Sequence, residues 1–323
     1  MERRYRRMKI VIVGSGGRLG AALMREYREK FDVVGFNHSQ LDLANVGEIH
    51  HNIDDLEFDV LINAAAFTNV DLAESQPESA FAINAEAPRL LAEICRNKKA
   101  RLIHFSTDYV FDGKKRKPYV ETDPAKPISV YGESKRAGEE NVLAAQDRSA
   151  SANASADRHL VVRVSWVFGP DRPSFIDAMI KRAREEEQIG AVADKFSTPT
   201  YTNDIARMLT QFFDVDVPDG VLHFANTGQC SWQEYAQHAL DSCRALGIPL
   251  KAKKVGPTKM ADMTRLRQTA SPARTYGGQA NWIARRPVYS VLSTAKYAKL
   301  TGVSPRSWRD AVADYIERSY SKK

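Results

Sequence analysis

Tyr131 and Lys135 form a Y-x-x-x-K pattern, a spacing that could support proton transfer. On a helix, residues four apart lie on one face, so the phenol and the ammonium would be neighbours. A free tyrosine has a pKa near ~10, and an adjacent positive charge lowers it. Such a tyrosine could give a proton to an alkoxide while hydride reaches a carbonyl carbon. The pair therefore predicts a reductase in which Lys135 also holds the nicotinamide ribose, although the pattern alone is common by chance.

A hydroxyl residue lies upstream of this pair, at the end of an apolar run. Residues 102–106 have the length of a buried strand, and Thr107 follows them, 24 residues before Tyr131. Parallel sheets place ligands at the carboxyl ends of their strands. We therefore expect the Thr107 hydroxyl to hydrogen-bond the substrate oxygen or to tune Tyr131. Thr107, Tyr131 and Lys135 together form the predicted catalytic group.

A glycine-rich loop follows the first apolar run, residues 10–13. Gly14, Gly17 and Gly20 give the pattern G-x-x-G-x-x-G, with Leu19 inside it. Glycine permits tight turns and lets backbone N–H groups approach a pyrophosphate at a helix N-terminus. Three glycines alone are a weak signal, but a position between a predicted strand and a predicted helix is the context that a dinucleotide site requires. The loop therefore predicts a nicotinamide dinucleotide cofactor.

The second predicted strand, residues 33–36, ends without the acid that usually binds the adenosine ribose of NAD. Asn37 stands there and would not repel a 2′-phosphate, and Arg18 in the glycine loop could pair with that phosphate. These residues favour NADPH as the cofactor, and NADH is the alternative. The other cofactor contacts that we expect are Asp42 and Leu43 beside the adenine, and Ala64, Ala65 and Ala66 at a strand end where small side chains would let the cofactor pass.

Short β-branched runs alternate with helical patterns over the first half of the chain. This alternation predicts an α/β fold of Rossmann type, a doubly wound parallel sheet with helices on both faces and a smaller C-terminal substrate-binding lobe. The apolar runs lie at residues 10–13, 33–36, 60–64, 102–106 and 160–164, with helical segments such as 19–30, 80–97 and 132–145 between them.

Changes in composition divide the chain into three parts. Residues 1–7 are expected to be a basic N-terminal extension, and residues 8–170 an NAD(P)-binding Rossmann domain. Residues 171–323 are expected to form mainly the substrate-binding lobe, which could return elements to the sheet. Two segments, 146–158 and 264–285, have the composition of surface loops and resemble insertions.

The composition is that of a soluble globular protein, with 43% hydrophobic and 27% charged residues among 323. The net charge is +7, and four of the arginines lie within residues 1–7; no basic stripe with interleaved aromatics follows, so no nucleic-acid partner is expected. No run approaches ~18 apolar residues, so no membrane span is expected. Three cysteines without a C-x-x-C pair favour a reduced, cytoplasmic protein. The histidines show no metal-ligand spacing, and we predict no metal.

Several longer motifs make the chain resemble the dTDP-4-dehydrorhamnose reductase family, within the extended short-chain dehydrogenases/reductases. They occur in family order over nearly the whole chain, and the second and third are highly specific together. The matching segments are residues 63–71 (NAAAFTNVD), 106–113 (STDYVFDG), 130–135 (VYGESK), 163–169 (RVSWVFG), 197–201 (STPTY) and 286–287 (RP).

The resemblance implies the reduction of a nucleotide-linked 4-keto-6-deoxy sugar, which completes an activated L-rhamnose. It implies that Thr107, Tyr131 and Lys135 are catalytic, and that Thr68, Val70, Thr107, Asp108 and Trp166 bind the sugar nucleotide. Some relatives hold Mg²⁺ between two subunits through a glutamate soon after the third glycine. This chain has Ala21-Ala22-Leu23 there, which supports the prediction of no metal; a homodimer is still compatible with the sequence.

Three alternatives stay open. The first is a nucleotide-sugar dehydratase or epimerase on the same fold. A dehydratase would need an acid after Asp108, where this chain has Tyr109, so elimination is disfavoured. A regulatory subunit like the β subunit of methionine adenosyltransferase could keep the same residues only to bind a dinucleotide. A reductase of another 4-keto sugar or carbonyl compound is compatible with the unusual 264–285 segment, because fold alone does not fix the substrate.

Overall fold

The computed structural model describes residues 7–145, 159–213, 220–265 and 283–321. The expected loop at 146–158, most of the segment 264–285 and the N-terminal extension up to residue 6 lie outside the described residues.

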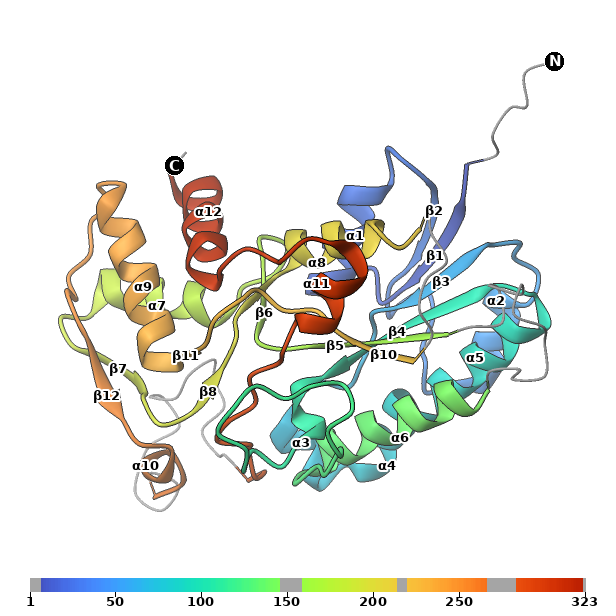
Figure 1. Ribbon diagram of the computed structural model, residues 1–323, viewed down its shortest axis with the longest axis horizontal. Coiled ribbons are helices and arrows are strands. Elements are labelled where there is room, and N and C mark those ends of the chain that lie inside the picture. The colour runs from blue at the N-terminus through green and yellow to red at the C-terminus, as the bar shows by residue number, and fades with distance from the viewer. Residues whose placement is uncertain (1–6, 146–158, 214–219, 266–282, 322–323) are drawn as a thin grey trace.

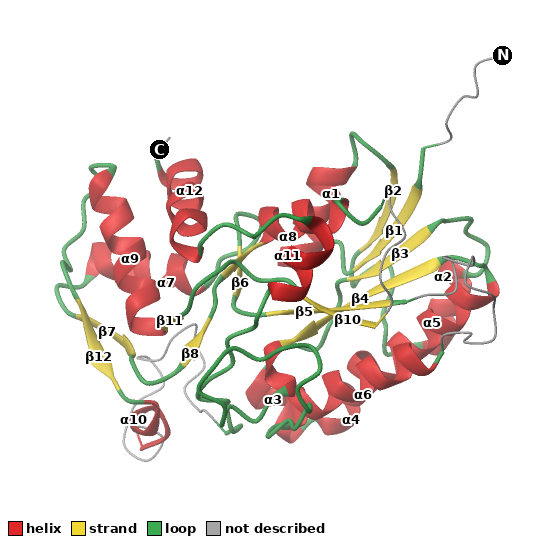
Figure 2. Ribbon diagram, in the orientation of Figure 1, coloured by secondary structure: helices red, strands yellow, loops and turns green. Residues whose placement is uncertain are grey.

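The centre of the described structure is a parallel sheet of six strands in the order β10-β5-β4-β3-β1-β2 (Figures 1 and 2). The chain runs from β1 outward to β2 and then crosses back to β3 on the other side of β1, so the winding direction switches between β1 and β3. Ligands bind at such a switch point, beyond the carboxyl ends of the strands. The predicted α/β fold is therefore confirmed. The strands are β1 Lys9–Val13, β2 Asp32–Phe36, β3 Val60–Asn63, β4 Arg101–Thr107, β5 Leu160–Val164 and β10 Gly220–His223.

Helices cover both faces of this sheet because its central strands are apolar on both sides. Ile10 and Ile12 point into one hydrophobic core, and their neighbours Val11 and Val13 point into the other. The first core is covered by α1 Arg18–Tyr27, α8 Thr202–Thr210 and α11 Ala295–Thr301, and the second by α2 Val46–Ile53, α5 Ala87–Asn97 and α6 Val130–Ala144.

A smaller part of the molecule lies beside the sheet and comes from the C-terminal half (Figure 1). Its core is aromatic, with Phe168, Tyr235 and Trp308 buried together. The elements of this part are β6 Val167–Phe168, α7 Phe175–Glu185, β7 Ile189–Val192, β8 Phe196–Ser197, β9 Thr200–Tyr201, β11 Cys230–Ser231, α9 Trp232–Ala245, β12 Val255–Thr258, α10 Met260–Arg265 and α12 Trp308–Tyr320. Within the described ranges, no helix combines the length and apolar character that crossing a membrane requires.

A third group of short helices joins β3 to α5 and supports α6. These are α3 Val70–Ser75, α4 Pro77–Phe81 and a π-helical segment, Ala82–Glu86, which runs directly into α5. Single π-helical turns are rare and are often found near functional sites. This one places Asn84 in the interior, where its side chain bonds the backbone of Phe67 and the hydroxyl of Ser134. The loop after β3 is thereby fixed against the helix that carries Tyr131 and Lys135.

Candidate active site

Tyr131 and Lys135 lie in the first turns of α6, and Thr107 is the last residue of β4. The helix begins here because Ser129 caps it, its hydroxyl accepting a hydrogen bond from the N–H of Gly132 at 3.2 Å. Gly132 also permits close packing, since a Cβ there would come within 2.4 Å of the Tyr109 carbonyl oxygen. Tyr109 and Tyr131 therefore meet edge to face, with ring centroids 5.6 Å apart. The structure thus brings the predicted Thr-Tyr-Lys group together.

The Tyr131 phenol is buried against Ala73 and Ala80. Burial raises its pKa to about 12, with the negative charge of Asp108 acting in the same direction and a hydrogen bond with Thr107 opposing them. A phenol in this environment keeps its proton at neutral pH. It is suited to donate a proton, which is the role that the reductive direction requires.

The Lys135 ammonium is also buried, and it has no direct carboxylate partner among the described residues. Its Nζ donates to the Phe105 carbonyl oxygen at 2.7 Å and lies 3.2 Å from Nε2 of His104. Burial lowers the pKa of Lys135 to about 8, against a small opposing attraction from Glu139. Glu139 lies one turn further along α6 and forms a two-pronged ion pair with Arg163, at 2.8 and 2.6 Å.

A chain of hydrogen bonds leads from Ala65, in the loop after β3, to Lys135. The N–H of Ala65 can only donate, and it bonds Oδ1 of Asn63 at 3.1 Å. The amide nitrogen of Asn63 then faces Nδ1 of His104 at 3.2 Å and donates to it. A neutral imidazole that accepts at Nδ1 carries its proton on Nε2, which faces Lys135. Because this N–H donates toward Lys135, it favours the uncharged amine of that lysine, as burial does.

The glycine loop has the shape of a cradle for the backbone of a dinucleotide. Gly14 has a φ of +81°, and a Cβ there would lie 2.6 Å from the Ala65 nitrogen. A Cβ at Gly20 would lie 2.1 Å from the Gly14 carbonyl oxygen. Gly17 is the N-cap of α1, and no side chain caps the helix, so its first N–H groups are available to an anion. Leu19 points into the core below the loop. These residues fit a pyrophosphate-bearing cofactor.

Two arginines, Arg18 and Arg172, lie near the predicted adenosine side of the cofactor site, and the sequence did not single out Arg172. Arg18 extends toward the C-terminal part, where its guanidinium donates to the carbonyls of Val167 and Arg172 at 3.3 and 3.2 Å. Arg172 extends in the opposite direction and donates to the Gly16 carbonyl at 2.6 Å. A Cβ at Gly16 would lie 3.2 Å from the Cβ of Asn37 and 3.8 Å from Nη2 of Arg172. Arg172 and Asn37 therefore both approach Gly16.

The other predicted cofactor residues lie around this cradle. Ala64 continues β3, donating to the Val13 carbonyl at 3.0 Å, and Ala65 and Ala66 follow it at the switch point. Asp42 is half-buried and its carboxylate accepts the N–H of Ala44 at 2.9 Å. Leu43 is buried in the core between the sheet and α5.

Of the predicted substrate residues, Asp108 is the most enclosed. Its carboxylate accepts from the hydroxyls of Thr107 at 3.2 Å, Ser197 at 3.1 Å and Ser290. Burial raises its pKa, while the nearby positive charge of Lys195 and these hydroxyls oppose the shift. Three separate segments of the chain therefore meet at one carboxylate beside Tyr131.

The remaining predicted substrate residues have different surroundings. Thr68 is exposed in the loop after β3, and Val70 packs with the Tyr131 cluster. Trp166 follows β5 with a φ of +39°, a backbone conformation that side-chain-bearing residues rarely adopt.

Asp71 and Arg286 form a buried ion pair that fastens the C-terminal segment to α3. Two hydrogen bonds of 2.5 and 3.1 Å join them, and the N–H groups of Ile283 and Ala284 also bond Asp71. The sequence placed both residues in matching motifs, but no spacing rule could pair positions 215 residues apart.

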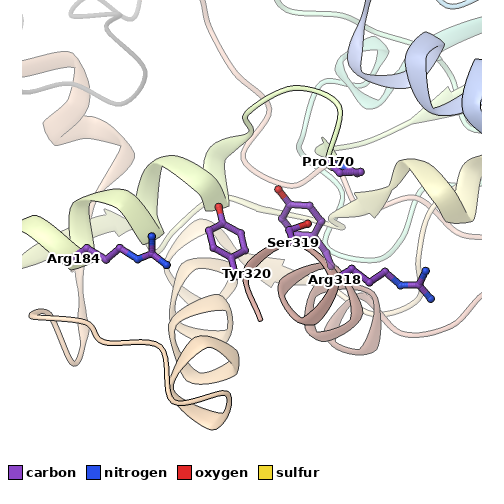
Figure 3. A pocket seen from close by; sticks show the side chains of 6 residues that line it. Pro170, Arg184, Arg318, Ser319 and Tyr320 are labelled. Carbon is purple, nitrogen blue, oxygen red and sulfur yellow. The ribbon is translucent and has the colours of Figure 1, made fainter. Parts of the chain in front are cut away.

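A surface hollow lies elsewhere, between α7 and the end of α12 (Figure 3). None of the predicted catalytic, cofactor or substrate residues lines it. The residues around it are Pro170, Arg184, Tyr315, Arg318, Ser319 and Tyr320.

A glycine cradle at the switch point of a Rossmann-type sheet, together with a buried, protonated tyrosine on α6, is the arrangement of a dinucleotide-dependent oxidoreductase. The chain belongs to the family described as RmlD substrate binding domain, whose model matches residues 8–321. The resemblance inferred from the motifs is thereby confirmed.

Relatives match over nearly the full length. The chain is 36% identical to a dTDP-4-dehydrorhamnose reductase of Mycolicibacterium smegmatis, covering 95% of this chain and 85% of that protein. It is 34% identical to a probable dTDP-4,6-dihydroxy-2-methyloxan-3-one 4-ketoreductase of Streptomyces antibioticus, covering 95% and 94%. Among solved structures, a dTDP-4-dehydrorhamnose reductase of Bacillus anthracis in complex with NADP matches with a TM-score of 0.82 at 29% identity, covering 97% of this chain and 99% of that one.

Proposed function

We propose that this enzyme reduces the 4-keto group of a nucleotide-linked 6-deoxy sugar, converting dTDP-4-dehydrorhamnose to dTDP-L-rhamnose with NADPH. The observation that carries the proposal is Tyr131, a buried phenol that holds its proton, next to Thr107 and on the same helix face as Lys135. The full-length likeness to dTDP-4-dehydrorhamnose reductases supports the same substrate.

The residues divide the chemistry between them. NADPH supplies the hydride to the carbonyl carbon when bound. Thr107 orients the carbonyl oxygen, and Tyr131 donates its proton to that oxygen as negative charge develops. An ammonium with a pKa of about 8 is a stronger acid than a phenol with a pKa of about 12, so Lys135 returns a proton to the phenolate. Thr68, Val70, Asp108 and Trp166 bind the sugar nucleotide.

We infer that NADPH is preferred over NADH. Gly14, Gly17 and Gly20 leave room for the pyrophosphate, and the carboxylate that would repel a 2′-phosphate is replaced by Asn37. Arg172 approaches Gly16, as Asn37 does, and we propose that it pairs with the 2′-phosphate. Arg18 then acts indirectly, because its guanidinium binds the carbonyls of the segment that carries Arg172.

We also propose the division into a dinucleotide-binding domain at residues 8–170 and a mainly substrate-binding lobe at 171–323. The separate aromatic core supports it, because all of its buried residues except Phe168 lie after residue 170. Strand β10 belongs to the sheet and helices α8 and α11 pack on it, although all three come from residues 171–323. The second part of the chain therefore contributes these elements to the first domain.

The test of the function is NADPH oxidation with dTDP-4-dehydrorhamnose and a panel of other nucleotide-linked 4-keto sugars. We expect turnover with dTDP-4-dehydrorhamnose, and Tyr131→Phe should lower kcat by at least a factor of ~10² while NADPH binding stays nearly intact. Wild-type activity in Tyr131→Phe would refute the assignment. Turnover of a different keto sugar alone would favour the alternative reductase, and NADPH binding without any turnover would favour a regulatory subunit.

A further inference from the structure

Lys195 is a buried ammonium for which the mechanism above has no use. It lies between β7 and β8 and has no exposed surface. Within the described part of the chain, its Nζ has no hydrogen-bond partner. It is surrounded by three aromatic rings, with centroids 5.2 Å away for Tyr109, 5.1 Å for Trp166 and 5.8 Å for Trp232. Cation–π attraction alone does not replace the hydrogen bonds that an ammonium makes in water.

A second unpaired donor lies in the same aromatic cluster. The indole Nε1–H of Trp166 is buried and has no partner among the described residues. Two hydrogen bonds hold the unusual backbone of Trp166. The Ser165 hydroxyl donates to the Thr198 carbonyl at 2.6 Å, and the N–H of Thr200 donates to the carbonyl of Trp166 itself. Strained backbone that its surroundings enforce is concentrated at ligand sites.

The cluster adjoins the proton donor. Tyr109 touches Lys195 on one side and Tyr131 on the other, with the two tyrosine rings 5.6 Å apart. Ser197, two residues after Lys195, bonds the Asp108 carboxylate at 3.1 Å. Two buried donors without acceptors among the described residues therefore lie in a cluster that is separated from the proton donor by the single ring of Tyr109.

We propose that Lys195 is a specificity-determining residue that, with Trp166, donates hydrogen bonds to a ring hydroxyl of the sugar, so that the enzyme requires a hydroxylated 4-keto sugar. This inference rests on the proposed function. The Lys195 ammonium would donate a hydrogen bond to the oxygen of the sugar hydroxyl. The Asp108 carboxylate already accepts from three hydroxyls, and its negative charge attracts the ammonium of Lys195.

The charge balance favours a neutral sugar hydroxyl over an acidic group. Arg286 is neutralised by Asp71 through a direct ion pair. Lys195 is attracted by Asp108 and repelled by Arg286, so these four buried charges sum to zero. A carboxylate or phosphate in this place would add an uncompensated negative charge to a buried region, which is costly. A hydroxyl oxygen accepts from both donors and leaves the balance unchanged.

A site built to bond a hydroxyl rejects the analogue that lacks it, because its own polar groups are then left unpaired. The test uses dTDP-4-dehydrorhamnose and its 2-deoxy and 3-deoxy analogues, with the full-length wild type, Lys195→Met, Lys195→Gln and the control Lys181→Met. Lys181 is an exposed lysine of α7 and controls for the loss of one positive charge. The readouts are KM and kcat for each sugar and the Kd of NADPH.

We expect Lys195→Met to raise KM for the hydroxylated sugar roughly 10- to 100-fold, the factor for losing a charge-assisted hydrogen bond, with NADPH affinity unchanged. Lys195→Gln, which keeps a neutral donor, should lie between Met and wild type. With the deoxy analogue that lacks the contacted hydroxyl, wild type and Lys195→Met should have equal KM.

Three results would overturn this inference without affecting the proposed function. They are an unchanged KM in Lys195→Met, the same rise in KM with all three sugars, or a parallel loss of NADPH affinity. The last two would mean that the lysine only supports the fold. If the wild type oxidises no NADPH with any of the sugars, the proposed function itself fails and this inference falls with it.

Discussion

Replacing Lys135 by methionine should make the protein more stable while it abolishes turnover. The side chain is 1% exposed, and the nearest acid on its own helix, Glu139, is already bound by Arg163. Burial lowers the pKa of Lys135 from 10.5 to about 8, a shift of about 2.5, which at ~1.4 kcal/mol per pKa unit makes the buried charge cost about 3 kcal/mol at pH 7. Methionine has a similar length and no charge, but it leaves the Phe105 carbonyl without its donor, which costs about 1–3 kcal/mol. The charge effect is the larger on balance, so we expect a net gain of about 1 kcal/mol.

The pH dependence of the free energy of unfolding separates the cost of the buried charge from the loss of the hydrogen bond to Phe105. Between pH 8 and 10.5 the unfolded chain holds a proton on Lys135 that the folded protein has lost, so the folded wild type gains stability as pH rises. The mutant lacks this gain. The free energy of unfolding from urea titrations, wild type minus Lys135→Met, should therefore increase by about 3 kcal/mol between pH 7 and 10.5. The exposed-lysine control Lys181→Met should show a nearly flat difference. A flat or falling difference for Lys135→Met would refute the idea that the buried ammonium is uncompensated.

Three further predictions concern the cofactor cradle and the support of α6. Gly20→Ala places a Cβ against the Gly14 carbonyl, so NADPH affinity measured by fluorescence titration should fall at least ~10-fold; an unchanged Kd would contradict the cradle. Asn37→Asp should raise KM for NADPH at least ~10-fold, with little change for NADH, because a carboxylate repels the 2′-phosphate; equal effects on both cofactors would remove Asn37 from that role. Glu139→Gln leaves a buried guanidinium uncompensated and should lower the free energy of unfolding by about 3–5 kcal/mol in urea titrations, and a loss below about 1 kcal/mol would show that the pair is not needed.

Local sequence patterns were sufficient for the parts of the fold that depend on neighbouring residues. The strand before Thr107 and the helix through Tyr131 and Lys135 are close to their predicted positions, because apolar runs and a Ser cap specify them directly. Strand β10 was not predicted. It has four residues and pairs with β5, 60 positions earlier, so only the assembled sheet makes it a strand.

The residues missed at the site come from segments far away in the sequence. Arg172 reaches the glycine loop 156 residues earlier, and no spacing rule connects them. Lys195 is one lysine among many in the sequence, and only its burial among aromatic rings distinguishes it. His104 lies within a predicted strand and is fully buried, but its contact with Lys135 depends on how β4 packs against α6. Sequence motifs were enough to propose the groups that react, whereas the groups that surround them could be found only in the structure.

The two buried lysines have a common physical origin. In both cases the nearby carboxylates are already occupied: Glu139 binds Arg163, and Asp108 binds three hydroxyls. The pKa of each lysine is lowered to about 8, mainly by burial, and neither ammonium has a direct carboxylate partner among the described residues. A fold selected only for stability would replace such charges with apolar side chains, because an unpaired buried charge is destabilising. We attribute their presence near Tyr131 to a ligand with oxygen acceptors, and stabilising substitutions in this protein should therefore be found at the residues on which substrate binding and turnover depend.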